Sequence, residues 1–136
     1  MSSVSIEFPL LYKQTPFGLL SDPKIPIEVK TLAGYRTYRF LLDTGADFSV
    51  VPRRLAQQVG LAWGTLPEAQ MVGVGQGSVE TRLGKLPVRL AHIEFTVHCL
   101  FVDTRIAFIL GRADFLERFA LTIDHSQQRI VLTDIA

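Results

Sequence analysis

One carboxylate in this sequence of 136 residues stands where proton-transfer chemistry is favoured. Asp43 ends the apolar run 40–42 and is followed by Thr44 and Gly45, a pair that favours a sharp turn. A carboxyl group at the end of a buried strand is partly desolvated and lies near the amide groups of the turn, and both conditions can tune it for acid–base chemistry. An aspartate that only caps its own turn has the same short pattern, so Asp-Thr-Gly alone leaves both interpretations open.

Two further segments add to this pattern. Residues 108–110 form a second apolar run, which ends at Gly111 and leads through Arg112 into a predicted helix. Between the two apolar runs, residues 71–77 contain three glycines, which predict the turn of a β-hairpin covering about residues 67–84. Each motif is weak by itself, whereas three in a fixed order are a specific signal.

In their order and spacing, over about residues 40–121, the three motifs resemble the retropepsins, the retroviral-type aspartic proteases. That family carries a catalytic Asp-Thr-Gly-Ala-Asp, then a glycine-tipped flap, then two apolar residues before Gly-Arg and a short helix. The resemblance implies a mostly-β fold, a closed β-barrel with one or two short helices. It also implies one domain over residues 1–136, with the flap hairpin at about 67–84.

The resemblance assigns roles to individual residues. It implies that Asp43 is the catalytic carboxylate, that Thr44 ties two active-site loops together, and that Gly45 lets the substrate backbone approach closely. Asp47 and Arg112 match a structural ion pair that locks the active-site loop to the following helix, although Arg112 could instead be a solvated residue of that helix. The substrate-binding residues that the resemblance implies are mostly apolar and favour peptides with hydrophobic residues around the scissile bond; they are Leu41, Ala46, Asp47, Phe48, Val50, Gly73, Val74, Gly75, Ala107 and Ile109.

A single Asp-Thr-Gly in the sequence has a consequence for assembly. Two-carboxylate hydrolysis needs one ionised group to activate water and one protonated group to polarise the carbonyl. The second Asp43 must therefore come from a second copy, so we expect a homodimer that acts on peptide or protein substrates, with contacts from the N-terminal strand and the C-terminal hairpin. The alternative is a dimeric peptide-binding or scaffolding module of the same fold with little turnover, which Gln76 in the glycine-rich turn favours weakly.

Most of the remaining sequence alternates between apolar and polar residues, which predicts strands. The expected strands cover residues 3–11, 25–29, 35–42 and 91–102, followed by a terminal hairpin over 121–132. Only two segments have helical spacing; these are residues 53–59, which stop at Gly60, and residues 113–119.

Composition excludes several functional classes. A hydrophobic fraction of 48% excludes intrinsic disorder, and a net charge of +1 gives no sign of nucleic-acid binding. No apolar run could span a membrane and the N-terminus does not resemble a signal peptide, so we expect a cytoplasmic protein without membrane association.

We also expect no metal and no cofactor. Cys99 is the only cysteine, which excludes an internal disulfide and a multi-cysteine metal site. His92, Glu94 and His98 share one face of a predicted strand, where polar residues are ordinary. A dinucleotide-binding motif would need a glycine where Ser78 stands.

Overall fold

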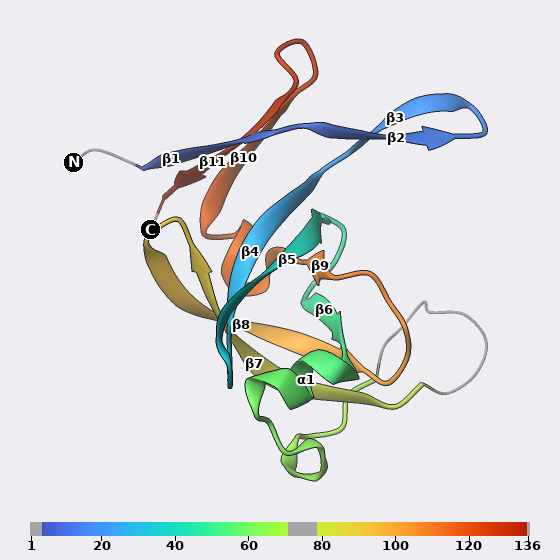
Figure 1. Ribbon diagram of the computed structural model, residues 1–136, viewed down its shortest axis with the longest axis vertical. Helices are drawn as coiled ribbons and strands as arrows, with labels where there is room; N and C mark the ends of the chain where they lie inside the picture. Colours follow the sequence, from blue (N-terminus) through green and yellow to red (C-terminus); the bar gives the residue numbers. More distant parts are fainter. Residues whose placement is uncertain (1–3, 71–78, 136) are drawn as a thin grey trace.

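The computed structural model describes residues 4–70 and 79–135, and six of its strands close into a barrel. Around the barrel the strands follow the order β4-β5-β9-β6-β8-β7 (Figure 1). This arrangement confirms the predicted mostly-β closed barrel. The barrel strands are β4 (Lys24–Thr31), β5 (Gly34–Leu42), β6 (Ser49–Pro52), β7 (Thr81–Leu90), β8 (Ile93–Val102) and β9 (Ile109–Leu110).

Alternation along the strands builds the barrel core. In β4, the side chains of Ile25, Ile27 and Val29 are fully buried, while the residues between them face outward. Strand β8 follows the same rule, with Val97 and Cys99 fully buried. Successive side chains of a strand point to opposite faces, so one face fills the barrel and the other lies outside it. Burial raises the pKa of the Cys99 thiol and keeps it protonated.

The pairing of the barrel strands places the segment that leads to Asp43 beside the segment that leads to Gly111. Strand β9 lies between β5 and β6, parallel to β5 with Leu42 opposite Leu110, and antiparallel to β6. Strand β6 in turn pairs in parallel with β8. The ends of β5 and β9, which precede Asp43 and Gly111, are therefore neighbours in space.

The two predicted helices have different outcomes. Helix α1 (Arg53–Val59) has the predicted bounds and ends at Gly60, whose φ of 91° is the left-handed conformation that favours glycine. The helix predicted over 113–119 is confirmed only in part, because a π-helix covers Arg112–Leu116 and its backbone angles at Ala113 and Asp114 are not helical. The segment η2 (Arg112–Leu116) is one irregular turn with a φ of 64° at Asp114, because Asp114 accepts a hydrogen bond from the His98 N–H (2.8 Å). A short 3₁₀ turn, η1 (Trp63–Thr65), follows α1.

A three-stranded sheet packs outside the barrel in the order β1-β11-β10 (Figure 1). It consists of β1 (Ser5–Pro9), β10 (Phe119–Asp124) and β11 (Arg129–Asp134), which confirms the predicted terminal hairpin. The single strand predicted over residues 3–11 is interrupted, because Leu10 is buried and its N–H donates to the Gln128 carbonyl (2.9 Å).

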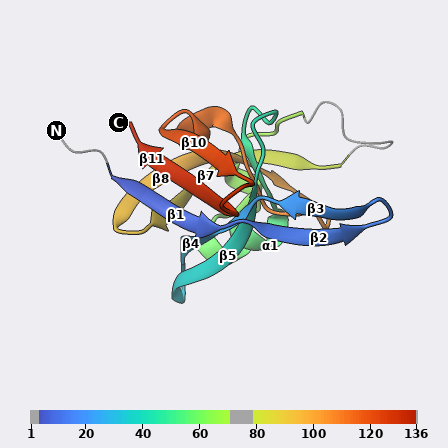
Figure 2. The same ribbon diagram turned by 90° about the horizontal axis from the view of Figure 1, so that it is seen from above.

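Beyond Leu10 the chain forms a hairpin that the sequence did not predict, made of β2 (Leu11–Thr15) and β3 (Gly18–Asp22). Seen from the front and from above, it projects away from the barrel (Figures 1 and 2).

None of the helices in residues 4–70 and 79–135 is long and apolar enough to cross a membrane.

Candidate active site

Asp43 lies at the end of β5, where backbone bonds hold the loop that follows. Its own N–H donates to the Leu110 carbonyl (3.0 Å), which ties Asp43 to strand β9. The Gly45 N–H donates to Oδ1 of Asp43 (2.9 Å), and the Ala46 N–H donates to the Asp43 carbonyl (3.2 Å). The carboxyl group is partly exposed, with one oxygen held by the turn, so it can still meet a water molecule or a second carboxyl group.

Gly111 interlocks the Asp43 loop with the segment after β9. Its N–H donates to the hydroxyl of Ser49 (3.1 Å), a side chain that is fully buried. The Arg112 N–H donates to the Ala46 carbonyl (2.9 Å). A Cβ atom on Gly111 would lie only 2.4 Å from the Phe48 carbonyl oxygen, so the two segments approach as closely as backbones can.

The guanidinium group of Arg112 adds a side-chain link to the same loop. It forms an ion pair with Asp47 and donates to the Thr44 carbonyl (3.2 Å). The Asp47 and Arg112 side chains are 74% and 46% exposed, so the pair adds little to folding stability and serves mainly to hold the loop. The Thr44 side chain is exposed, and its role in tying two active-site loops together stays a prediction.

A cleft of about 380 Å³ opens beside the loop. Five predicted site residues line it, namely Gly45, Ala46, Asp47, Phe48 and Val50. Three others are outside its lining: Leu41 and Ile109 face each other across β5 and β9, and Ala107 is exposed in the loop before β9. The predicted flap residues Gly73, Val74 and Gly75 lie outside the described residues.

Comparison with known proteins agrees with this geometry. The model of the aspartyl protease family matches residues 27–113, which include all of the barrel except the first residues of β4, together with the Asp43 loop and Gly111. The chain belongs to the aspartyl protease family. No curated protein sequence matches it significantly.

Solved structures of retropepsin-like proteases share the fold. A retropepsin-like aspartic protease from Rickettsia conorii is 20% identical with a TM-score of 0.67, and the match covers 98% of this chain and 95% of that one. The protease of EIAV, solved with the inhibitor HBY-793, is 25% identical with a TM-score of 0.54 over 71% of this chain and 86% of its own. The retroviral protease-like domain of Ddi1 from Leishmania major is 24% identical with a TM-score of 0.52, covering 79% and 84%.

Four cleft residues of this aspartyl protease family member were missed from the sequence: Ala69, Gln70, Leu83 and Leu100. Leu83 and Leu100 are opposite each other in the β7–β8 register. Both occupy positions that alternation assigns to the outer face, where neighbouring residues such as His98 are exposed. A leucine at a position where the alternation of the strand predicts a polar residue was the signal that could have identified Leu83 and Leu100.

The exposed Asp47–Arg112 ion pair of this retropepsin-like protein predicts that a substitution can lower activity strongly and stability only slightly. Arg112→Lys keeps the charge but loses the planar fork that reaches both Asp47 and the Thr44 carbonyl. We expect the free energy of unfolding to fall by less than about 1 kcal/mol, because the pair is exposed. Peptide-cleaving kcat/KM should fall about 10- to 100-fold, because small displacements of reacting groups are costly. Urea unfolding measures the change in stability, and steady-state kinetics measure the change in kcat/KM. The control is Arg105→Lys, outside the Asp43 loop. If it lost as much kcat/KM as Arg112→Lys, the role of Arg112 in holding the loop would be contradicted.

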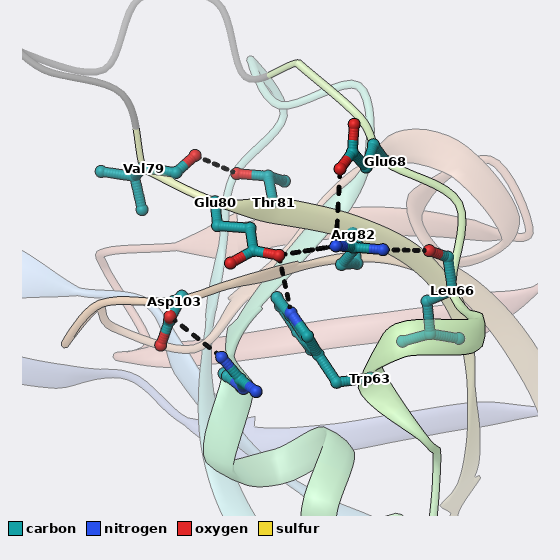
Figure 3. A network of polar contacts seen from close by, with 9 residues as sticks. Trp63, Leu66, Glu68, Val79, Glu80, Thr81, Arg82 and Asp103 are labelled. Atoms are coloured by element: carbon teal, nitrogen blue, oxygen red, sulfur yellow. Dashed lines mark hydrogen bonds and ion pairs between the residues drawn. The ribbon is translucent and has the colours of Figure 1, made fainter.

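A polar network joins the two chain segments that flank residues 71–78 (Figure 3). Oε1 of Glu80 accepts hydrogen bonds from the Trp63 indole (3.0 Å) and from Nη2 of Arg82 (2.7 Å). Arg82 also donates to the Leu66 carbonyl (2.9 Å) and lies 3.5 Å from Glu68. The hydrogen bonds from Arg82 and Trp63 hold the pKa of Glu80 below its usual value of 4.5. The network fixes Glu80 and Arg82 against the segment that carries Leu66.

This network predicts an acid transition that Trp63, the single tryptophan, reports by fluorescence. Folding lowers the pKa of Glu80 below its usual value of 4.5, so the charged carboxylate stabilises the folded protein fully above pH 4.5. This stabilisation is lost as the pH falls through the lowered pKa of Glu80 in the folded protein. We expect a fluorescence midpoint below pH 4.5 that disappears in Glu80→Gln and remains in Glu68→Gln, whose carboxylate is 80% exposed. Far-UV circular dichroism separates this transition from unfolding. The same transition in Glu80→Gln would contradict the assignment.

The polar face predicted for β8 forms side-chain hydrogen bonds. Nδ1 of His98 lies 2.7 Å from Oδ2 of Asp114, and Glu94 accepts a hydrogen bond from the Tyr35 hydroxyl (2.9 Å). Across residues 4–70 and 79–135, no three His, Cys, Asp or Glu side chains gather as a metal site would require.

Proposed function

We propose that this protein is a homodimeric aspartic endopeptidase in which the Asp43 carboxyl groups of two copies activate one water molecule. The observation that carries the proposal is the position of Asp43. It stands at the junction of β5 and β9, one carboxylate oxygen is held by the Gly45 amide, and the cleft opens at the same loop. The family match and the retropepsin-like fold support the same conclusion.

The proposed reaction uses the two carboxyl groups in different protonation states. The ionised group takes a proton from water, whose oxygen bonds to the carbonyl carbon of the scissile peptide. The protonated group donates to the carbonyl oxygen as negative charge develops there. When the tetrahedral intermediate breaks down, the C–N bond is cleaved and the amine leaves with a proton from the carboxyl pair. As the carbonyl re-forms, one hydroxyl group of the intermediate returns its proton to the pair, which restores the starting state.

One copy of the chain supplies one of these carboxyl groups. Asp47 is the next carboxylate along the loop, and its ion pair with Arg112 commits it to a positioning role. The sequence has no second Asp-Thr-Gly. A second copy related by a two-fold axis would bring its own Asp43 to the first, where two close carboxyl groups share one proton.

The lining of the cleft supports peptides as the substrate class. Ala46, Phe48, Val50, Leu83 and Leu100 give it mostly apolar walls. Such walls favour an extended peptide with apolar side chains on either side of the cleaved bond.

Cleavage of a mixed peptide library, read by mass spectrometry between about pH 4 and pH 7.5, tests the proposal. We expect wild type to cleave after or before apolar residues and a statine-type transition-state mimic to block it, while Asp43→Asn cleaves nothing. If wild type and Asp43→Asn bind the same peptides saturably and neither cleaves them, the protein is a peptide-binding module.

A further inference from the structure

The hairpin of β2 and β3, called the arm below, presents large apolar side chains to solvent. Phe17 at its tip is fully exposed, Leu19 is 73% exposed and Leu20 is 54% exposed. Within the described residues, β2 and β3 pair only with each other and leave both outer edges of the arm open. A two-stranded hairpin alone is marginally stable in water, and open edges invite pairing, so such an arm is typical of an interaction surface.

The turn of the arm is well formed. The Thr15 hydroxyl donates to the Gly18 carbonyl (2.7 Å) and accepts a hydrogen bond from the Phe17 N–H (3.1 Å). Gly18 has a φ of 108°, which glycine adopts readily. These contacts order the turn that carries Phe17. In both views the hairpin of β2 and β3 extends away from the barrel (Figures 1 and 2).

The base of the arm lies next to the catalytic loop. The Pro23 carbonyl, directly after β3, accepts a hydrogen bond from the Leu42 N–H (3.0 Å), and Lys24 pairs with Leu41. The arm therefore begins beside the residue that precedes Asp43. A second copy whose Asp43 shares a proton with this one must come within about 3 Å of that place. Five-residue strands extend about 15 Å, so the body of the second copy comes within reach of the arm.

We infer that the arm of each copy packs against a second copy of this chain and stabilises the dimer that completes the active site. The inference rests on the proposed function, because the proximity of the arm to Asp43 selects a second copy as its occupant. That contact buries four exposed side chains of the arm, and two-fold symmetry makes each of them contribute twice. They are Tyr12, Phe17, Leu19 and Leu20.

The test compares the double variant Phe17→Ser/Leu19→Ser with wild type by sedimentation velocity. Both side chains are exposed in the single chain, so the fold measured by circular dichroism should not change. We expect the dimer dissociation constant to rise at least about 10-fold, as loss of aromatic anchors does at interfaces. Peptide-cleaving activity per subunit should fall at low protein concentration and return at high concentration. The matched control is Leu32→Ser, a 79% exposed leucine in the β4–β5 turn at the opposite end of β4, which should dimerise as wild type does.

A photo-crosslinking residue at position 17 gives a second readout that does not depend on affinity. Phe17→p-benzoylphenylalanine should yield a covalent dimer on illumination, with the linked peptide identified by mass spectrometry. A wild-type dimer that is active, is unchanged in the double variant and gives no crosslink would overturn the role of the arm and leave the proposed function standing. A wild type that stays monomeric would overturn both. Wild-type binding to phosphatidylcholine vesicles that the double variant loses, with an unchanged dimer, would show a lipid-facing arm and overturn the inference.

Discussion

Asp43→Asn in both copies is expected to lower kcat at least about 10³-fold while the fold and the dimer persist. Asparagine has nearly the same shape, and its amide oxygen can still accept the hydrogen bond that the Gly45 N–H donates to Oδ1. It carries no exchangeable carboxyl proton, so it can neither deprotonate water nor share a proton with its counterpart. Steady-state kinetics on a cleaved peptide measure the loss, and sedimentation with circular dichroism verifies the assembly.

The control for this substitution is the same change of charge away from the loop. Glu94→Gln replaces a carboxylate on the outer face of β8, where it accepts a hydrogen bond from Tyr35. Its activity should stay within about twofold of wild type. An Asp43→Asn variant that kept more than about a tenth of the wild-type kcat would contradict the catalytic role of Asp43.

Gly111→Ala is expected to cause the largest loss of stability. The added Cβ would lie 2.4 Å from the Phe48 carbonyl oxygen, 2.5 Å from the Phe48 carbonyl carbon and 2.9 Å from the Ala46 oxygen. All three are backbone atoms, and the Ala46 carbonyl also accepts the Arg112 N–H, so none can move without breaking the interlock. We expect the free energy of unfolding to fall by about 3 kcal/mol, the upper end for overpacked sites, with a parallel loss of activity.

Gly64→Ala is the matched control for Gly111→Ala. A Cβ on Gly64 meets no atom within 4 Å, so the free energy of unfolding should stay within about 0.5 kcal/mol of wild type. Urea unfolding followed by Trp63 fluorescence compares the two variants. If Gly111→Ala were as stable as Gly64→Ala, the close approach of the two loops would not be a determinant of the fold.

The sequence predicted the parts of the fold that local patterns control. Alternation places Ile25, Ile27 and Val29 inside the barrel, and a left-handed glycine ends α1 at Gly60. The helix predicted at 113–119 is only a short, distorted turn over Arg112–Leu116, because hydrogen bonds from distant segments override the local preference. The Ala113 N–H donates to the Asp47 carbonyl, and Asp114 is drawn to His98. The arm was missed because its leucines are exposed and do not follow the inside–outside rule.

The candidate site was predictable in part for the same reason. The residues around Asp43 are consecutive, so one motif located Gly45 to Phe48, and the structure gathers them at one cleft. The Ser49 hydroxyl accepts the Gly111 N–H across 62 residues of sequence, a contact that no local pattern encodes. Leu100 lies in the cleft because it is paired with Val50 of β6. Only the parallel pairing of β6 with β8 brings these two residues together.

Subunit mixing tests the central claim, that two Asp43 carboxyl groups from two copies form one site. Wild type and Asp43→Asn are refolded together at equal amounts and constant total protein, and peptide cleavage is compared with wild type alone. Random pairing leaves two carboxyl groups in one quarter of the dimers, so the account predicts about 25% of the wild-type activity. An activity of about 50%, in proportion to the wild-type subunits, would mean that each copy acts alone and would contradict it.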